Sequence, residues 1–550
     1  MIPPMPRPSP AAPLLRPPLL LLRAVTLALA VLAGATSATP ALAGPPSPSP
    51  AFEALAATFK REMDSDKPEA RLRAMQRAAG SKEPAAVDLL MSGVARELVR
   101  RAAAAKAQTE TAAALETSLS EITRLNATSP RTGDQIEAYN KKMTKLEGKR
   151  DEANARLREL AVDQTEGRGV LDAGVRGIAA VLDALPPALA TPAFERVTAA
   201  WAGPKSPPDD RVRWVDVTSA VRQHPFSARL HDVVIDEAAD PRVRIAALEG
   251  AVARGEPTAL VDAIGCLSST AWNLVATAVE GLARLHKQEA IEPLIALLGR
   301  KDAARLRLDA QRALRSLTGQ AHGPYQQPWH DWWESEKARF QMPPAAVAPP
   351  QAGEAQKGVT FYGITTPSDK ILFILDVSGS MLEPAHPDAA GARADVKRID
   401  LARKELSAAI DLLDESKRFN VILFSHRVVR WQLAPVEGER SSADKAKRFA
   451  VETEAAGGTN IHDALEMAFK AANTAADGKS YLAAYDTFFF MTDGTPTAGK
   501  LQKPDEILAA VREWNRTAKV VIHCVGVGDA ADADFLGKLA AENGGVFVKR

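Results

Sequence analysis

The feature that most constrains this chain is an apolar run that ends abruptly in small and acidic residues. Residues 370–375 read KILFIL, and residues 376–380 read DVSGS. An apolar run with almost no polar interruption is typical of a strand that is covered on both faces, as in a parallel sheet between two layers of helices. Such sheets bind ligands at the carboxyl ends of their strands. Asp376 and the small residues after it therefore mark a candidate ligand-binding edge.

Further strands of the same sheet are predicted downstream. Each is a short apolar run between turns or helical stretches: residues 418–425 (RFNVILFS), 428–433, 487–492 (TFFFMT), 520–527 (VVIHCVGV) and 546–549. The run at 428–433 is predicted to be an edge strand. Strands that alternate with helices are typical of an open, doubly wound α/β fold. Residues 359–550 are therefore predicted to form one Rossmann-like α/β domain.

Two later turns carry polar residues that complement the DVSGS turn. Residues 457–460 (GGTN) open a helix, and Asp493 directly follows the strand at 487–492. Because the carboxyl ends of parallel strands meet at one edge of a sheet, Asp376, Thr459 and Asp493 are expected to lie close together. Hydroxyl and carboxylate oxygens are the ligands that hard divalent cations bind. The sequence therefore predicts a cation site at this edge.

In this order and spacing, the DxSxS, GGT and TDG turns resemble those of von Willebrand factor type A (VWA) and integrin I domains. The resemblance covers residues 359–550 and implies a metal-ion-dependent adhesion site. The five side chains that such a site uses are all present: Asp376, Ser378, Ser380, Thr459 and Asp493. By resemblance, the serines bind the cation directly, the threonine binds when a ligand is present, and the aspartates act mostly through water. The expected cation is Mg²⁺, with Mn²⁺ or Ca²⁺ as alternatives.

A site of this composition suits an acidic partner. Mg²⁺ is octahedral and retains water where the protein offers few carboxylates. Neutral hydroxyl ligands leave much of the charge of the ion uncompensated, so an acidic side chain can replace one water. The resemblance thus implies a protein partner that supplies Asp or Glu to the metal.

One segment beside the predicted site departs from the family pattern. Residues Met381–Lys397 lie between the DVSGS turn and a helix that is expected to begin near Arg398. This insertion contains His386, Asp388 and Asp395. It would border the metal and either tune or shield it; an ordinary long surface loop is the alternative.

The chain before this domain repeats itself. Residues 247–250 (ALEG) are matched by 278–281 (AVEG) thirty-one residues later, and 310–314 (AQRAL) follow thirty-two residues after that. Each unit is predicted to be two amphipathic helices with a short turn, which resembles HEAT-type repeats. One unit cannot bury its own apolar face. Residues 166–340 are therefore predicted to stack into a helical solenoid.

A helical hairpin is predicted ahead of the repeats. Apolar residues recur at spacings of three and four on both sides of a Pro- and Gly-containing break at 126–133. A short connection between two such helices makes them fold back antiparallel. Residues 94–165 are therefore predicted to form a projecting coiled-coil hairpin. The alternative is two ordinary helices of a globular bundle.

Two features end the helical region. Trp329, Trp332 and Trp333 fall on one helical face, which favours a hydrophobic cap on the last repeat over an aromatic binding platform. Residues 341–358 are rich in proline and alanine and are predicted to be a linker.

Residues 1–43 have the pattern of a removable export signal. A basic leader precedes the apolar run Ala24–Ala33, and residues 41–43 (ALA) give a small-x-small cleavage site. Residues 44–93 then hold a Pro/Ser spacer and a helical segment. The expected location is periplasmic or extracellular; an uncleaved membrane anchor is the alternative. The chain after the signal contains no apolar run long enough to predict a membrane span.

The overall composition narrows the choice of partners. A formal net charge of +1 gives no reason to expect a nucleic-acid partner. The two cysteines, Cys266 and Cys524, are expected to be buried thiols, with a bridge between them as the alternative. The oligomeric state is not indicated.

The sequence as a whole predicts a multidomain protein, first helical and then α/β, that acts by binding. Repeats followed by a DxSGSM turn resemble a type of multidomain VWA protein found in bacteria such as planctomycetes. No nucleophile–His–Asp set, phosphate loop or suitably spaced pair of acids indicates an enzyme. The predicted function is an exported scaffold that binds protein through a Mg²⁺ site. The alternatives are an assembly or chaperone-type VWA factor and a Mg²⁺-dependent hydrolase.

Overall fold

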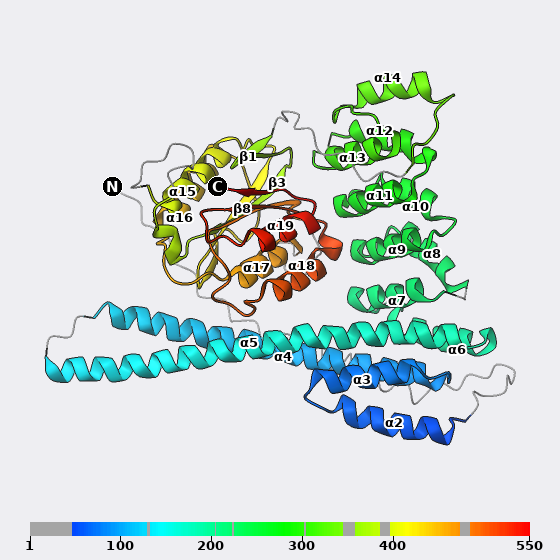
Figure 1. The fold of residues 1–550 in the computed structure, drawn as a ribbon, viewed down its shortest axis with the longest axis horizontal. Coiled ribbons are helices and arrows are strands. Elements are labelled where there is room, and N and C mark those ends of the chain that lie inside the picture. Colours follow the sequence, from blue (N-terminus) through cyan, green and yellow to red (C-terminus); the bar gives the residue numbers. More distant parts are fainter. Residues whose placement is uncertain are drawn as a thin grey trace, which may run out of the picture.

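A computed structural model of the protein shows an array of helices beside an α/β domain, with a long helical hairpin along both (Figure 1). It describes residues 47–128, 132–203, 205–222, 225–301, 304–344, 358–385, 396–473 and 484–550. The predicted signal at 1–43 lies outside the described residues, as do His386, Asp388 and Asp395 of the insertion. None of the helices in these ranges combines the length and the apolar character needed to cross a bilayer.

Proline sets many of the helix starts in the first part of the chain. It occupies the first position of α2, α3, α6, α7 and α9, where its fixed φ fits the helix and an N–H would have no partner. The helices are α2 (Pro50–Met63), α3 (Pro68–Ala79), α4 (Ala85–Asn126), α5 (Gly133–Ala184), α6 (Pro187–Trp201), α7 (Pro208–Ala220), α8 (Arg229–Ile235), α9 (Pro241–Arg254), α10 (Ala259–Cys266), α11 (Trp272–Leu285), α12 (Ile291–Leu298), α13 (Leu306–Thr318) and α14 (Gln326–Glu336).

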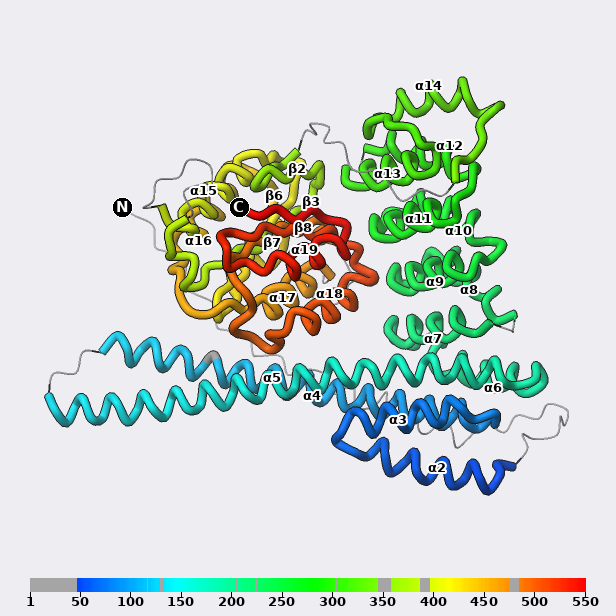
Figure 2. The backbone as a smooth tube through the Cα atoms, in the orientation of Figure 1, coloured from blue at the N-terminus to red at the C-terminus, as the bar shows by residue number. Residues whose placement is uncertain are grey.

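The hairpin is formed by α4 and α5, which lie side by side for much of their length (Figure 2). It is longer than the predicted span of 94–165, and both predicted boundaries fall inside continuous helices. Glycine explains the difference. A Cβ atom at Gly93 would lie 2.6 Å from Met75, and one at Gly167 would meet the Glu97 carboxylate. These glycines allow helices to approach closely, so the base of the hairpin belongs to the helical core.

The repeats stack as predicted. Helices α7, α9, α11 and α13 follow one another in one layer, and α8, α10 and α12 pack against them as a second layer (Figure 1). The glycine of each ALEG-type motif lies where a neighbouring helix packs. A Cβ atom at Gly250 would collide with Ser219 of α7, and one at Gly281 would lie 3.0 Å from Val252 of α9. The glycine that recurs in the sequence therefore corresponds to a close contact that recurs between stacked helices.

The three tryptophans cap the array, as predicted. Trp329 and Trp333 are buried in the core of the helical region, and Trp332 packs against it. Phe340 covers Trp332 and Trp333 at ring-centroid distances of 5.7 and 5.4 Å. The indole N–H of Trp329 donates to the Gly323 carbonyl at 2.8 Å, so its one polar group is satisfied.

The α/β domain has the predicted doubly wound sheet. The strand order is β5-β4-β3-β7-β8-β9; β3, β4, β7, β8 and β9 run parallel, and the short β5 and β6 pair antiparallel with β4. The strands are β3 (Lys370–Asp376), β4 (Arg418–Phe424), β5 (Val428–Arg430), β6 (Val436–Glu437), β7 (Thr487–Thr492), β8 (Val521–Gly526) and β9 (Phe547–Lys549).

Both faces of the sheet are covered, which explains the continuous apolar run of β3. Leu372 and Ile374 pack in one core with α17 (Ile461–Asn473), α18 (Pro504–Ala518) and α19 (Ala533–Glu542). Ile371, Phe373 and Leu375 pack in another core with α15 (Arg398–Asp411) and α16 (Arg440–Glu452). The first helix of the domain begins at Arg398, as the sequence indicated.

A small hairpin that the sequence did not predict precedes the sheet. Strands β1 (Val359–Phe361) and β2 (Ile364–Thr366) pair antiparallel around Tyr362 and Gly363, which have φ values of 50° and 81°. Two positive φ angles are typical of a tight hairpin turn. Phe361 packs on Phe373 and closes the core on the side of α15.

The helical array contacts the α/β domain at the amino ends of its strands. Lys519, between α18 and β8, places its ammonium 2.8 Å from Glu249 and 3.0 Å from Glu280. These two glutamates occupy the same position in the ALEG and AVEG motifs. Arg516 forms a further pair with Asp216 of α7, at 3.1 Å.

The array also satisfies backbone carbonyls at the end of α18, which have no helical partners, and one carbonyl directly before β7. Asn273 donates to the Thr517 carbonyl at 2.8 Å. Arg305, which lies over the ring of Trp272, donates to the carbonyls of Lys519 and Asp486. The contact between the two parts of the chain is therefore largely polar and charged.

We expect Lys519→Glu to separate the two parts of the molecule. The change places a third carboxylate against Glu249 and Glu280, and like charges at this distance repel. Small-angle X-ray scattering should show a larger radius of gyration. The triple variant with Glu249→Lys and Glu280→Lys should restore the wild-type value.

Lys538→Glu is the matched control, because Lys538 is exposed on α19 and pairs only with Asp534 in the described residues. An unchanged radius of gyration in Lys519→Glu would mean that the docked arrangement does not depend on this ion pair.

His523 of β8 is buried in its neutral form. Its ring stacks on Phe489, and Nδ1 accepts the Val546 N–H at 3.1 Å, so that nitrogen carries no proton. Burial, helped by the positive charges of Arg312 and Arg305, lowers the pKa of His523 to about 3. An unfolded chain protonates this histidine below about 6.5, whereas the folded chain does not. The stability that the buried neutral His523 contributes to the fold is complete above pH 6.5, and it is lost as the pH falls from 6.5 towards 3.

We therefore expect His523→Phe to reduce the pH dependence of stability. The melting temperature of the wild type should fall more between pH 7.5 and pH 5 than that of the variant, as measured by calorimetry. His330→Phe, at an exposed position of α14, should behave as the wild type does. Equal losses in the wild type and His523→Phe would contradict the assignment.

Candidate metal centre

The structure brings the five predicted ligands together at the carboxyl edge of the sheet. Asp376 ends β3, and Ser378 and Ser380 follow it in a turn that continues into the short 3₁₀ helix η4 (Gly379–Leu382). Thr459 lies two residues before α17, and Asp493 directly follows β7. Four of the five are buried, and Ser380 is partly exposed. The site is therefore closed on the protein side and accessible near Ser380.

Backbone contacts hold the two glycine-containing turns against each other. The Val377 N–H donates to the Phe424 carbonyl at 2.7 Å, and the Gly379 N–H donates to the Gly457 carbonyl at 2.9 Å. Gly457 has a φ of 78°, and a Cβ atom there would overlap the ring of His426. Glycine is thus required at this position for the turns to approach.

A continuous set of hydrogen bonds links four of the five residues. The carboxylate of Asp376 accepts the Ser378 N–H at 2.7 Å and the Thr492 hydroxyl at 2.5 Å. The hydroxyls of Ser378 and Ser380 lie 3.1 Å apart, and Ser380 donates to Asp493 at 2.8 Å. The oxygen atoms of these residues therefore converge.

Thr459 approaches this group from the other side of the edge. Its N–H donates to the Thr497 hydroxyl at 2.8 Å, and its carbonyl accepts the N–H groups of Thr497 and Ala498. A Cβ atom at Gly494 would lie 3.6 Å from the Thr459 hydroxyl. The hydroxyl thus faces the residue next to Asp493.

The two acidic side chains differ in how their charge is compensated. Both have no exposed side-chain surface, but only Asp493 has a cation beside it, the guanidinium of Arg398 at 3.0 Å. No ion pair of Asp376 is present in the described parts of the chain. Burial raises the pKa of Asp376 to about 7, against the lowering effect of hydrogen bonds from Thr492 and Ser378.

The donor set fits a hard divalent cation. All five side chains offer oxygen, and the group contains neither thiolate nor imidazole. Oxygen-only sets suit Mg²⁺, Mn²⁺ or Ca²⁺ rather than zinc or copper. A buried carboxylate without a positive partner is costly, and a bound cation would remove that cost.

The base of the predicted insertion closes next to the site. The Ala385 N–H donates to the Val396 carbonyl at 2.8 Å, and the Arg398 N–H donates to the Glu383 carbonyl at 3.0 Å. The Arg398 side chain bonds to both Glu383 and Asp493. Sequence reasoning did not identify Arg398 as part of the site, because nothing in the local pattern indicates where such a long side chain points.

A second cluster of potential metal ligands lies on α17. Ligand atoms of His462, Asp463 and Glu466 lie within 4.8 Å of one another. The ammonium of Lys500 pairs with Glu466 and lies 3.9 Å from Asp463. Burial alone would raise the pKa of Asp463, but the bond from His462 and the charge of Lys500 outweigh it and lower the pKa to about 2. Lys500 therefore already supplies the positive charge here.

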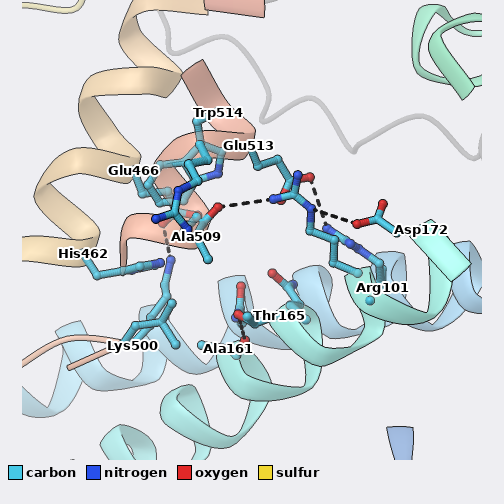
Figure 3. Close-up of a pocket in the computed structure, with 17 residues that line it drawn as sticks. Arg101, Ala161, Thr165, Asp172, His462, Glu466, Lys500, Ala509, Glu513 and Trp514 are labelled. Atoms are coloured by element: carbon cyan, nitrogen blue, oxygen red, sulfur yellow. Dashed lines mark hydrogen bonds and ion pairs between the residues drawn. The ribbon is translucent and has the colours of Figure 1, made fainter. Parts of the chain in front are cut away.

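This second cluster borders a cavity of about 410 Å³ between the hairpin and the α/β domain (Figure 3). Arg168 of α5 lines this cavity and bonds with Glu513 of α18 at 2.9 Å, and Arg101 of α4 lies 3.8 Å from the same carboxylate. The ring of His462 packs against Trp514 at a centroid distance of 5.4 Å and a tilt of 59°, and its Nδ1 atom lies 2.7 Å from the Asp463 carboxylate. The charged groups here are paired with one another and leave no evident ligand site.

The predicted cysteines are both free and buried. Cys266 lies in α10 of the helical array and Cys524 lies in β8. The alternative of a bridge between them is wrong for this structure, and burial raises the pKa of both thiols.

Comparison with known proteins gives two family matches. A model of the von Willebrand factor type A domain matches residues 370–548, and a model of HEAT repeats matches residues 230–315. The two matches cover different parts of the chain, in the order that the repeats and the sheet take in the structure.

The curated relatives match about a third of this chain. Inter-alpha-trypsin inhibitor heavy chain H4 of Homo sapiens is 31% identical over 185 residues, which cover 34% of this chain and 18% of that protein. Heavy chain H2 of Mesocricetus auratus is 32% identical over 177 residues, which cover 32% of this chain and 17% of that protein. The chain thus matches less than a fifth of the length of these relatives.

A solved von Willebrand factor type A structure from Catenulispora acidiphila is 20% identical, with a TM-score of 0.26, and covers 34% of this chain and 39% of that one. A likeness of that size carries no weight, so the assignment rests on the family models, the relatives and the sheet itself. Together these show that the chain contains HEAT repeats followed by a von Willebrand factor type A domain.

Proposed function

We propose that this protein is an exported scaffold that binds an acidic residue of a partner protein through a divalent cation, Mg²⁺, in its VWA domain. The ligands are Asp376, Ser378, Ser380, Thr459 and Asp493. The observation that carries the proposal is the convergence of these oxygens around a fully buried carboxylate, Asp376, that has no cationic partner in the described residues. The leader-like segment 1–43 supports export.

The proposed ligands are of two kinds, charged carboxylates and neutral hydroxyls. Asp376 and Asp493 provide negative charge, and the hydroxyls of Ser378, Ser380 and Thr459 provide neutral oxygens. A bound cation would supply Lewis acidity towards an anionic ligand, because few carboxylates offset its charge. The partial exposure of Ser380 leaves this edge open to a partner.

The helical array supports the proposed role of scaffold. Its contacts with the VWA domain involve Lys519, Thr517 and the Asp486 carbonyl, which lie at the amino ends of the strands. The candidate metal centre lies at the carboxyl ends. Docking of the array therefore leaves the metal edge free for a partner.

Binding is favoured over catalysis by what surrounds the ligands. In the described residues, the side chains that hydrogen-bond to the five ligands from outside the set are Thr492, Thr497 and Arg398. None of these is a general base at neutral pH. A hydrolase would need one within reach of an attacking water.

We expect titration calorimetry of the full chain with Mg²⁺ to show one binding site that Asp376→Asn abolishes. Asparagine keeps the shape of the side chain but removes the charge that the cation compensates. The melting temperature should rise with Mg²⁺ in the wild type only, since a ligand at 100 times its Kd stabilises by about 2.7 kcal/mol.

Asp463→Asn is the matched control, because it removes a carboxylate from the Lys500 cluster instead. This variant should bind Mg²⁺ as the wild type does. Binding that survives Asp376→Asn but is lost in Asp463→Asn would move the cation to the second cluster and overturn the proposal.

We further expect the immobilised protein to retain a partner from the exported fraction of its source cells in a Mg²⁺-dependent manner. EDTA should release the partner, excess Mg²⁺ should restore binding, and Ser378→Ala should retain none, since it removes one hydroxyl ligand. Retention that is equal with EDTA, or equal in Ser378→Ala, would show that the partner does not bind through this site.

A further inference from the structure

Arg398 is a buried cation inside the candidate metal centre. It is the first residue of α15 and is only 7% exposed. Its Nη1 atom lies 3.0 Å from the carboxylate of Asp493, which is completely buried, and 2.9 Å from Glu383. The guanidinium also packs on the backbone at Gly528, where a Cβ atom would lie 2.9 Å from Nε. The side chain therefore has a fixed position.

The same interactions fix the position of Asp493. One carboxylate oxygen accepts the Ser380 hydroxyl at 2.8 Å, and the other accepts from Arg398 at 3.0 Å. Asp493 is thus oriented from two sides by groups of the protein alone. The Arg398 N–H donates to the Glu383 carbonyl, and Pro384 and Lys397 form a β-bridge, so the backbone at the start of α15 is joined to the base of the insertion.

The charge balance of the site follows from this arrangement. When both are ionised, as a bound cation would require, Asp376 and Asp493 carry two negative charges, and Arg398 places one positive charge 3.0 Å from Asp493. A divalent cation that binds between the aspartates meets this positive charge in a buried setting, where screening by water is weak. Arg398 is therefore expected to hold the metal ligand Asp493 in place and, at the same time, to repel the cation.

We propose that Arg398 is a positioning residue and a built-in counter-charge of the metal centre: it holds Asp493 in place without the cation and weakens cation binding. This inference rests on the proposed function. The charge of a weakly held cation is compensated less by the protein, so the cation attracts an acidic partner more strongly. It also means that the site is assembled before the cation arrives.

The variant Arg398→Gln retains a hydrogen-bond donor but has no charge. It allows the positioning of Asp493 and the repulsion of the cation to be measured separately. Titration calorimetry of the full chain with Mg²⁺ alone should show binding tighter by about tenfold or more, as expected when one nearby positive charge is removed. In EDTA, the same variant should melt at a lower temperature than the wild type, because Asp493 is left as a buried charge without a cation.

Three further variants test alternative explanations. Arg398→Lys retains the charge and should bind Mg²⁺ within about threefold of the wild type. Glu383→Gln removes the other partner of Arg398 and should also leave the Mg²⁺ affinity within that range. This variant tests whether Arg398 acts on the metal centre through Asp493 or only by holding the insertion through Glu383. Arg398→Met repeats the test without a hydrogen bond, should the glutamine variant not fold.

The outcomes of this experiment separate the two proposals. Equal or weaker Mg²⁺ binding in folded Arg398→Gln and Arg398→Met, with binding in the wild type, would overturn the role of Arg398 and leave the metal centre standing. Absence of Mg²⁺ binding in the wild type and in both variants would overturn the metal centre itself.

Discussion

The parallel pairing of β3 with β4 on one side and β7 on the other is the constraint on which the candidate metal centre depends. It places Asp376 beside Phe424, and Leu375 beside Met491, so that the turns after these strands begin at nearly the same level. Apolar side chains cover both faces of β3. A shift of one residue would exchange the side chains of the two cores and move Asp376 out of the turn. The position of the site is therefore a consequence of sheet register.

The helical array and the VWA domain are joined by the same motif that builds the array. In ALEG and AVEG the glycine permits close packing of the preceding helix of the layer, and the glutamate before it contacts Lys519. The third motif, AQRAL, carries Arg312 at the equivalent position, and this side chain pairs with Asp309 instead. The acidic surface that receives Lys519 thus ends after two repeats, which fixes where along the array the domain docks.

The strands and the five ligands could be predicted because their signals are local. Apolar runs such as 370–375 and 487–492 are compatible with few structures, and the polar turns follow them directly. The hairpin is longer than the predicted span of 94–165 because α4 and α5 continue past both limits. Gly93 and Gly167 are sites of close packing inside these helices, and a local pattern does not show whether a glycine in a helical stretch marks an end or a packing contact.

Contacts between distant parts of the chain could not be predicted from the sequence. Arg398 lies 95 residues from Asp493, and Lys519 lies 270 residues from Glu249. Lysine and arginine side chains are long, and nearly every helix surface carries them. Which of them becomes buried depends on how rigid elements come together, and a single sequence holds no local record of that.

The length of α5 gives the hairpin a mechanical property. As one uninterrupted helix of 52 residues it extends roughly 78 Å. It contacts α7 of the array near one end, and Arg168 joins it to Glu513 of the VWA domain in its second half. The free tip is therefore the long arm of a lever whose fulcrum lies against the VWA domain. A sideways load on the tip is converted into torque at that contact.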